Sequence, residues 1–267
     1  MMRIRLKLKG CTMNRTSMLV VLTMLTTLPL MAQNTAGDEA TIEPRQVIDS
    51  PTAGLLKRGA FGMDVDFFQE GGVGVALSAG ALDRLNFGLS YGGTQILGHE
   101  KVTMQRLPGI NIKYRFIDES TFLPAIAIGF DTQGKESYID STERFTIKSK
   151  GLFVAASKNY KFFGNLSLHG GINKSMETGD GDKDLDVFVG AEKSFGPDIS
   201  LLFEYDFGFN DNASLSVGKG RGYMNAGMRW SFGNGFTLGF DLKNLVKNQD
   251  QVSVGNRLIK IEYVRTL

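Results

Sequence analysis

The feature that most constrains the fold is a strict alternation of long and short links between strand-like segments. After residue 59, about twelve runs alternate apolar and polar residues. The links after the third, fifth, seventh, ninth and eleventh runs are long and polar: residues 93–107, 133–149, 175–183, 210–221 and 244–256. The links between them are short: residues 80–83, 117–121, 161–164, 194–198 and 233–235. Short turns at one end and long loops at the other are typical of a bacterial outer-membrane β-barrel, with the turns in the periplasm.

Most runs have two distinct faces. In residues 61–67, Phe61, Met63, Val65 and Phe67 share one face, whereas Asp64 and Asp66 lie on the other. A soluble sandwich would show the same alternation. Run lengths close to the roughly 9–11 residues of a tilted membrane strand favour the barrel. We therefore predict an all-β fold, an antiparallel up-and-down transmembrane β-barrel of about twelve strands over residues 59–267, with a secreted soluble β-domain as the alternative.

The last run carries a candidate insertion signal. Ile259, Ile261, Tyr263 and Leu267 lie in register at the end of the chain. Such a terminal strand is what the barrel-insertion machinery of the outer membrane recognises. We expect that machinery, outer-membrane lipid and lipopolysaccharide as partners.

The first 32 residues have the order of a secretory signal peptide. Basic residues precede an apolar run over residues 18–31, and Ala32 is the predicted cleavage site. Met1 and Met13 are both candidate starts, and a membrane anchor is the weaker alternative because the run is short for a helical span. We predict a leader over residues 1–32, a periplasmic segment over residues 33–58, and an outer-membrane location of the Gram-negative type.

Cleavage of the leader changes both the charge and the cysteine content. It removes five of the 30 basic residues and none of the 28 acidic ones, so residues 33–267 carry a net charge of −3. This balance argues against binding of nucleic acid. Cys11 is the single cysteine and leaves with the leader, which excludes disulfide and thiol chemistry from the mature chain. No cofactor is expected.

If the polar face lines the interior, the lumen carries charges of both signs. The predicted acidic lining is Asp64, Asp66, Asp131, Asp186, Glu192, Glu204, Asp206, Asp241 and Glu262. The predicted basic lining is Lys113, Arg115, Arg229, Lys243 and Lys260, and His169 has the same inward parity. Twelve strands are intermediate between a filled barrel and an open pore, and we expect opposite charges to pair across the lumen and close it. An open lumen with this acidic excess would weakly favour cations.

A catalytic site is weakly indicated. Of the two histidines, His99 lies in a long link, and His169 shares a face with Ser167 two residues away. A lumenal histidine bonded to a carboxylate is the simpler interpretation. We recognise no nucleophile–base arrangement of the kind that membrane-embedded hydrolases use and predict no catalytic residues.

One long link spaces three carboxylates as the first half of a calcium loop does. These are Asp180, Asp182 and Asp184, but the twelfth position from Asp180 is Ala191 where a calcium loop of this kind needs Glu. A solvated, sharply turning loop is the favoured interpretation, with loose binding of divalent ions as the alternative.

The segment before the first strand contains the box Asp49-Ser50-Pro51-Thr52-Ala53, followed by Gly54 and the run into Phe61. It resembles the opening of YjbH-like outer-membrane proteins, and further matches lie in residues 83–93, 108–115 and 123–131. The chain is similar to a short, single-barrel member of that family. The resemblance implies an outer-membrane barrel associated with extracellular polysaccharide or its export components, and it supplies no catalytic residues.

Three functions follow from these observations. The first is a non-enzymatic accessory or scaffold barrel linked to exopolysaccharide production or export, with a closed lumen. The alternative is a small passive porin-like channel with a weak cation preference, which requires a gap between the lumenal charges. A second alternative is an outer-membrane enzyme acting on lipid or glycan, for which His169 and His99 are the residues to substitute.

Overall fold

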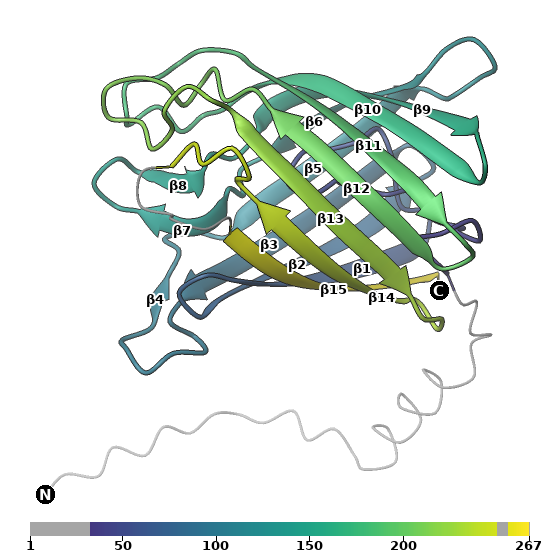
Figure 1. Cartoon of the computed structure of the whole chain (residues 1–267), viewed down its shortest axis with the longest axis horizontal. Helices are drawn as coiled ribbons and strands as arrows, with labels where there is room; N and C mark the ends of the chain where they lie inside the picture. Colours follow the sequence, from purple (N-terminus) through teal and green to yellow (C-terminus); the bar gives the residue numbers. More distant parts are fainter. Residues whose placement is uncertain (1–32, 250–255, 267) are drawn as a thin grey trace, which may run out of the picture. The chain divides into compact units, whose positions relative to one another are not determined.

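The computed structural model describes residues 33–249 and 256–266 as an all-β fold (Figure 1). The predicted leader and Leu267 lie outside the described residues. The strands that follow the chain are β1 (Ala60–Phe68), β2 (Gly72–Leu82), β3 (Leu85–Thr94), β4 (Thr103–Met104), β5 (Gly109–Ile117), β6 (Ala125–Asp131), β7 (Lys135–Ile139), β8 (Arg144–Ile147), β9 (Gly151–Lys161), β10 (Asn165–Lys174), β11 (Asp186–Phe195), β12 (Ile199–Asp206), β13 (Tyr223–Ser231), β14 (Phe236–Lys243) and β15 (Asn256–Thr266).

Within the described residues, twelve antiparallel strands close into a barrel, as predicted. Every wall strand pairs with its neighbour in the chain, and β1 closes the barrel by pairing with β15 from Ala60↔Thr266 to Phe67↔Ile259. The two-residue strand β4 pairs only with the end of β3, and β7 and β8 form a separate hairpin. Because every wall strand has two partners, the barrel leaves no open sheet edge.

The barrel wall is apolar outside and polar inside. In β3, Phe87 is 50% exposed and Leu89 is 56% exposed, whereas the preceding Asn86 and the neighbouring Lys113 of β5 are buried. A soluble protein buries its apolar face, so this inverted pattern is that of a barrel whose outer surface faces lipid. No helix among the described residues is long and apolar enough to cross a membrane.

The two ends of the barrel differ. Tight turns join β2 to β3, β11 to β12 and β13 to β14, whereas the links at the other end, apart from the three residues between β1 and β2, are long and include the β7–β8 hairpin (Figure 1). The residues before β1 also belong to the fold. Three of the four small apolar clusters contain residues of the segment 33–58, for example Leu56 with Val264 and Ile48 with Leu202. The wall therefore folds around this segment.

Candidate functional site: a hairpin in the barrel lumen

Residues 33–58 lie inside the barrel, where we predicted a periplasmic segment. The chain enters beside the β11–β12 turn, where the backbone N–H of Asp38 donates to the carbonyl of Gly196 (2.9 Å). It reverses at a bridge between Gln46 and Pro51 and returns to the same end of the barrel. We call residues 33–58 the plug hairpin. The position differs from the prediction because the segment carries apolar and charged groups that complement the inner wall.

The tip of the plug hairpin is bound by one wall carboxylate. The backbone N–H groups of Ile48, Asp49 and Ser50 donate to Glu204 over 3.0, 3.0 and 2.8 Å, and Asn225 donates from its side chain over 3.0 Å. Glu204 is fully buried. Successive N–H groups that converge on one carboxylate form an anion nest, and hydrogen bonds to an ionised acceptor are stronger than neutral ones. Asp49 and Ser50 of the Asp-Ser-Pro-Thr-Ala box thus lie at the tip of the plug hairpin, and the rest of the box begins the return path of the chain.

The tip also meets the long loops. The Asp49 carboxylate lies 2.8 Å from Lys243 Nζ, which in turn lies 3.2 Å from Glu136 on the β7–β8 hairpin. The neighbouring Lys135 reaches the Gln46 side chain over 3.4 Å. The plug hairpin is therefore connected to the loop end of the barrel as well as to its wall.

Along its shaft, the plug hairpin meets both charges and neutral groups of the wall. Arg45 pairs with Asp64 and Glu262, each at 2.8 Å. Lys113 Nζ donates to the backbone carbonyl of Arg45 over 2.8 Å and to that of Gly54 over 3.2 Å. These contacts satisfy wall charges that would otherwise be buried without a partner.

The predicted lumen-lining residues lie in three environments. Paired within the wall are Arg229 with Asp241, and Lys260 with Asp66. Bound to the plug hairpin are Asp64, Lys113, Arg115, Glu204, Lys243 and Glu262. Elsewhere on the inner wall are Asp131, Asp186, Glu192, Asp206 and His169, of which Asp206 pairs with Lys150. We expected charge pairs across the lumen to close it, but the chain itself fills the lumen.

His169 does not pair with Ser167. Its Nδ1 lies 2.8 Å from the hydroxyl of Ser157, which also accepts the backbone N–H of Ala53 over 2.9 Å. Ser167 instead donates to Asn159. The alternative bond from His169 to a carboxylate is also absent among the described residues, where its Nε2 has no hydrogen-bond partner. Ser157 and His169 thus lack the third residue that orients the histidine in Ser–His hydrolases. His99 is exposed on its loop.

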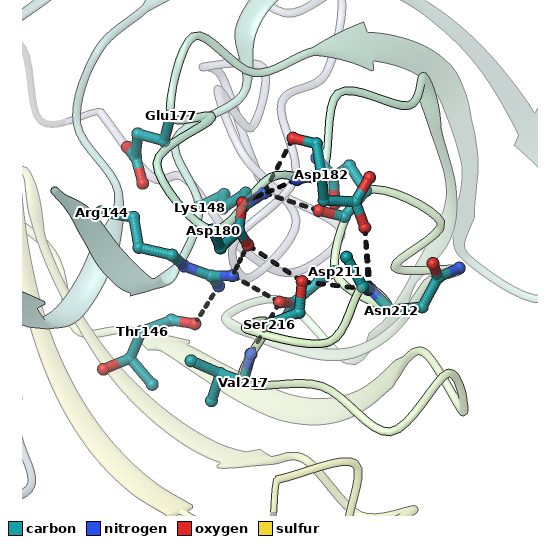
Figure 2. A network of polar contacts seen from close by, with 12 residues as sticks. Arg144, Thr146, Lys148, Glu177, Asp180, Asp182, Asp211, Asn212, Ser216 and Val217 are labelled. Carbon is teal, nitrogen blue, oxygen red and sulfur yellow. Dashed lines mark hydrogen bonds and ion pairs between the residues drawn. The ribbon is translucent and has the colours of Figure 1, made fainter. Parts of the chain in front are cut away.

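Two of the three carboxylates that suggested a cation loop, Asp180 and Asp182, bind the chain's own cations and backbone (Figure 2). The third, Asp184, is exposed. Arg144 lies between Asp180 and Asp211, and Lys148 Nζ lies 2.8 Å from Asp180. Asp182 accepts the backbone N–H of Asn212 over 3.0 Å. Asp180 and Asp182 are buried, so the prediction of a solvated loop was wrong for these two residues, whereas Asp184 is exposed. No cluster of three or more His, Cys, Asp or Glu side chains that could hold a metal ion occurs within the described part of the chain. We call residues 144–148, 177–184 and 210–217 the loop cap.

The pKa values of two carboxylates in the loop cap are shifted in opposite directions. Burial alone would raise the pKa of Asp180, but its hydrogen bonds from Lys148 and from the backbone of Asp182, together with the charge of Lys148, lower the pKa. Burial raises the pKa of Glu177 despite its hydrogen bonds from Ser149 and Phe145. The loop cap therefore keeps Asp180 ionised and disfavours the charge on Glu177.

Three cavities adjoin one another along the lumen. Two of them, the middle one and the one at the turn end, lie between the plug hairpin and the wall, whereas the one at the loop end is lined by wall and loop residues. The one at the loop end and the middle one share Ala76, Ser90, Gln133 and Lys135 in their linings. The middle one and the one at the turn end share Thr35, Pro44 and Glu192. Their empty spaces, open mouths included, are about 750, 1020 and 1160 Å³. Cavities thus adjoin one another along the lumen, and the plug hairpin lines two of the three.

Sequence reasoning missed the plug contacts at Arg45, Asp49 and Ser157. One signal could have found the first two. The segment 33–58 holds apolar pairs, Val47-Ile48 and Leu55-Leu56, which a solvated linker would not carry. Such pairs indicate a segment that is buried against other parts of the protein.

No family model and no curated protein matches the chain. Among solved structures, the fold is similar to a KdgM porin, with 8% identity over 76% of this chain and 98% of that one, and a TM-score of 0.49. It is also similar to a NanC porin, with 7% identity over 78% of this chain and 99% of that one, and a TM-score of 0.44. A third similar structure is Omp33 of Acinetobacter baumannii, with 8% identity over 78% of this chain and 97% of that one, and a TM-score of 0.42.

Proposed function

We propose that the protein is a small porin-like channel that the plug hairpin holds closed. The observation that carries the proposal is the line of adjoining cavities along the lumen, two of which lie between the plug hairpin and the wall. A structural barrel filled only for stability would pack this contact closely, as protein interiors do. The sequence-based alternative of a passive channel is therefore preferred over the scaffold linked to exopolysaccharide, and no catalytic residue is assigned.

The chemistry of the contact supports a displaceable plug. Its attachment combines hydrogen bonds, ion pairs such as Arg45 with Asp64, and small apolar contacts such as Val47 with Leu202. Water can replace polar partners of this kind at modest cost, whereas a large apolar interface would oppose separation. Emptied of residues 33–54, a barrel of twelve strands is wide enough to hold water.

The test compares residues 33–267 with a variant that lacks residues 33–54, both refolded and inserted in a planar bilayer in potassium chloride. We expect the complete mature chain to be closed for most of the time and the deletion variant to give stable conductance steps. The deletion removes the plug partners of three acidic wall residues (Asp64, Glu204 and Glu262) and of three basic ones (Lys113, Arg115 and Lys243). Because acidic residues outnumber basic ones among the predicted lining residues, its current should weakly prefer cations. Neutralising Asp64 and Glu262 in the deletion variant should reduce that preference. A deletion variant that folds, inserts and stays silent would refute the channel.

A further inference from the structure

The cavity at the loop end has the composition of a site for a small ligand. It lies between the ends of β1–β3 and the β7–β8 hairpin. Its lining includes the aromatic residues Phe68, Tyr138 and Phe145 together with polar groups from the wall and the loops. Ligand sites are typically apolar concavities with a few placed polar groups, and this cavity has both.

The aromatic surface is fixed in place by packing. The rings of Tyr138 and Phe145 meet edge to face, with centroids 5.1 Å apart and planes at 78°. Phe145 is buried, and its ring lies against Gly134 so closely that a Cβ there would come within 2.4 Å of the Phe145 side chain. A fixed aromatic pair offers flat apolar surface at little cost in side-chain entropy.

Neutral hydrogen-bonding groups lie beside the aromatic pair. The amides of Gln105 and Gln133 donate to each other over 3.1 Å in both directions. Ser90 also donates to Gln133, over 2.9 Å. Side-chain amides and hydroxyls both donate and accept, so they can exchange hydrogen bonds with the hydroxyl groups of a ligand.

One charged atom in the lining lacks a hydrogen bond. Asp66 Oδ1 is buried, and among the described residues it accepts no hydrogen bond. Lys260 Nζ lies 3.6 Å from it, and Lys135 Nζ lies 3.7 Å from the second oxygen. The two lysines oppose a cationic ligand, and Asp66 with Glu136 opposes an anionic one. A neutral hydroxyl group satisfies the free acceptor without adding charge.

We propose that this cavity binds an uncharged saccharide. The aromatic pair provides the apolar surface for a sugar ring, Gln105 and Gln133 bind its hydroxyl groups, and Asp66 Oδ1 accepts a hydrogen bond from one of them. The inference rests on the proposed function in treating this saccharide as the solute that the channel admits from the loop end.

Calorimetric titration of the refolded mature chain, residues 33–267, tests the site directly. The protein is kept in an amine-oxide detergent, because a maltoside head group is itself a neutral saccharide. The probes are maltotriose and xylotriose as neutral trisaccharides, trigalacturonate as an anionic one, and the glucosamine trimer as a cationic one. We expect at least one neutral probe to bind about tenfold or more tightly than either charged probe.

Substitutions locate the binding. Tyr138→Ala should weaken the neutral probe about tenfold, and Asp66→Asn and Gln105→Ala should each weaken it several-fold. Tyr160→Ala, at a tyrosine that is 48% exposed and outside the cavity lining, is the matched control and should leave the affinity unchanged. Far-ultraviolet circular dichroism of each variant confirms that the barrel has folded.

Absence of binding by both neutral probes would overturn the inference, and so would equal affinity for a charged probe or unchanged affinity in folded Tyr138→Ala. The channel itself is tested in potassium chloride without any saccharide. Conductance of the variant that lacks residues 33–54, combined with failure of these titrations, would therefore refute the saccharide site and leave the channel standing.

Discussion

The plug hairpin fills the lumen from the turn end, and the loop cap joins three of the long links at the loop end. The two regions are held by different groups. At the tip of the plug hairpin, three backbone N–H groups bind the carboxylate of Glu204. In the loop cap, the Arg144 side chain binds two carboxylates, Asp180 and Asp211. The plug tip thus depends on the path of its backbone, whereas the loop cap depends on side-chain charge.

The difference indicates which conditions should act on each end. Three backbone donors of the plug tip share one acceptor, so substitution of Glu204 removes several hydrogen bonds at once. Buried ion pairs are costly to break because removing one partner leaves the other charged and desolvated. The loop cap should therefore respond to charge substitutions and to acid. Because residues 33–267 contain no cysteine, a single introduced cysteine can report on each region separately.

The largest effect is expected from Glu204→Ala, which leaves three buried N–H groups of the tip without an acceptor. Each such group costs about 1–3 kcal/mol, so the tip should leave its site far more often. The reporter is Ser50→Cys, since Ser50 is fully buried and its hydroxyl makes no hydrogen bond among the described residues. We expect maleimide labelling of this cysteine to accelerate about 100-fold or more.

Two controls accompany the Glu204 experiment. Glu100→Ala, at an exposed loop carboxylate, should leave the labelling rate of Ser50→Cys unchanged. A cysteine in the loop cap at Val217 should label at its original rate in Glu204→Ala. Unchanged labelling of Ser50→Cys in Glu204→Ala would mean that the nest does not hold the tip.

Arg144→Met should have the next largest effect and should act on the loop cap. It leaves Asp180 and Asp211 buried with one cation fewer, and breaking a buried pair in this way costs about 3–5 kcal/mol. We expect labelling of Val217→Cys to accelerate and that of Ser50→Cys to stay unchanged. Arg106→Met is the matched control, because Arg106 pairs with Glu143 in an exposed position. Equal acceleration at both reporters would show that plug and cap open together.

Acid should loosen the loop cap by a smaller amount. The pKa of Asp180 is lowered, so its stabilising contribution is complete above the ordinary carboxyl pKa and is lost as the pH falls through the lowered value. Burial raises the pKa of Glu177, so acid neutralises an unfavourable buried charge there and acts in the opposite direction. Hydrogen exchange of residues 175–185, corrected for the intrinsic rate at each pH, should speed up below about pH 4.

The variant Asp180→Asn separates the contributions of Asp180 and Glu177 to the pH dependence. It should exchange faster at neutral pH and lose the acid-induced acceleration, which leaves only the opposite trend from Glu177. Acceleration of the same size in Asp180→Asn and in the unaltered chain would assign the pH dependence to another group.

The smallest effect is expected at the exposed ion pairs. Arg84 pairs with Asp118 near the turn end, and both side chains are about half exposed. Arg84→Ala should change the free energy of unfolding by less than about 0.5 kcal/mol, as measured by urea titration, and should alter neither cysteine reporter. A larger change would mean that exposed ion pairs also stabilise the plug hairpin or the loop cap.

Much of the fold could be predicted from the sequence because strand periodicity is local. The alternation of Phe87 and Leu89 with Asn86 assigns both faces of β3 without knowledge of its neighbours. Link lengths order the strands, since consecutive antiparallel strands need only a short turn at one end. The barrel of twelve strands was confirmed for these reasons.

Contacts between distant parts of the chain could not be predicted in the same way. Asp180 and Asp182 matched a cation loop in spacing, but Asp180 binds Arg144 and Lys148, which lie more than thirty residues away. Asp182 binds the backbone of residues 212–213. His169 was placed beside Ser167 by parity along its own strand, whereas its partner Ser157 lies on the neighbouring strand β9. Residue spacing shows which groups can meet locally and is silent about partners on other strands.

The sequence by itself determined the barrel, its inner and outer faces, and the lengths of its loops, because these depend on the side-chain pattern of each strand. Only the tertiary structure decided what fills the barrel. Whether Arg45 and Asp49 stay in solvent or enter the lumen depends on Asp64, Glu262 and Lys243, which come together only when β1, β14 and β15 have paired. Burying those charges is favourable once their partners are in place, and no local pattern encodes that arrangement.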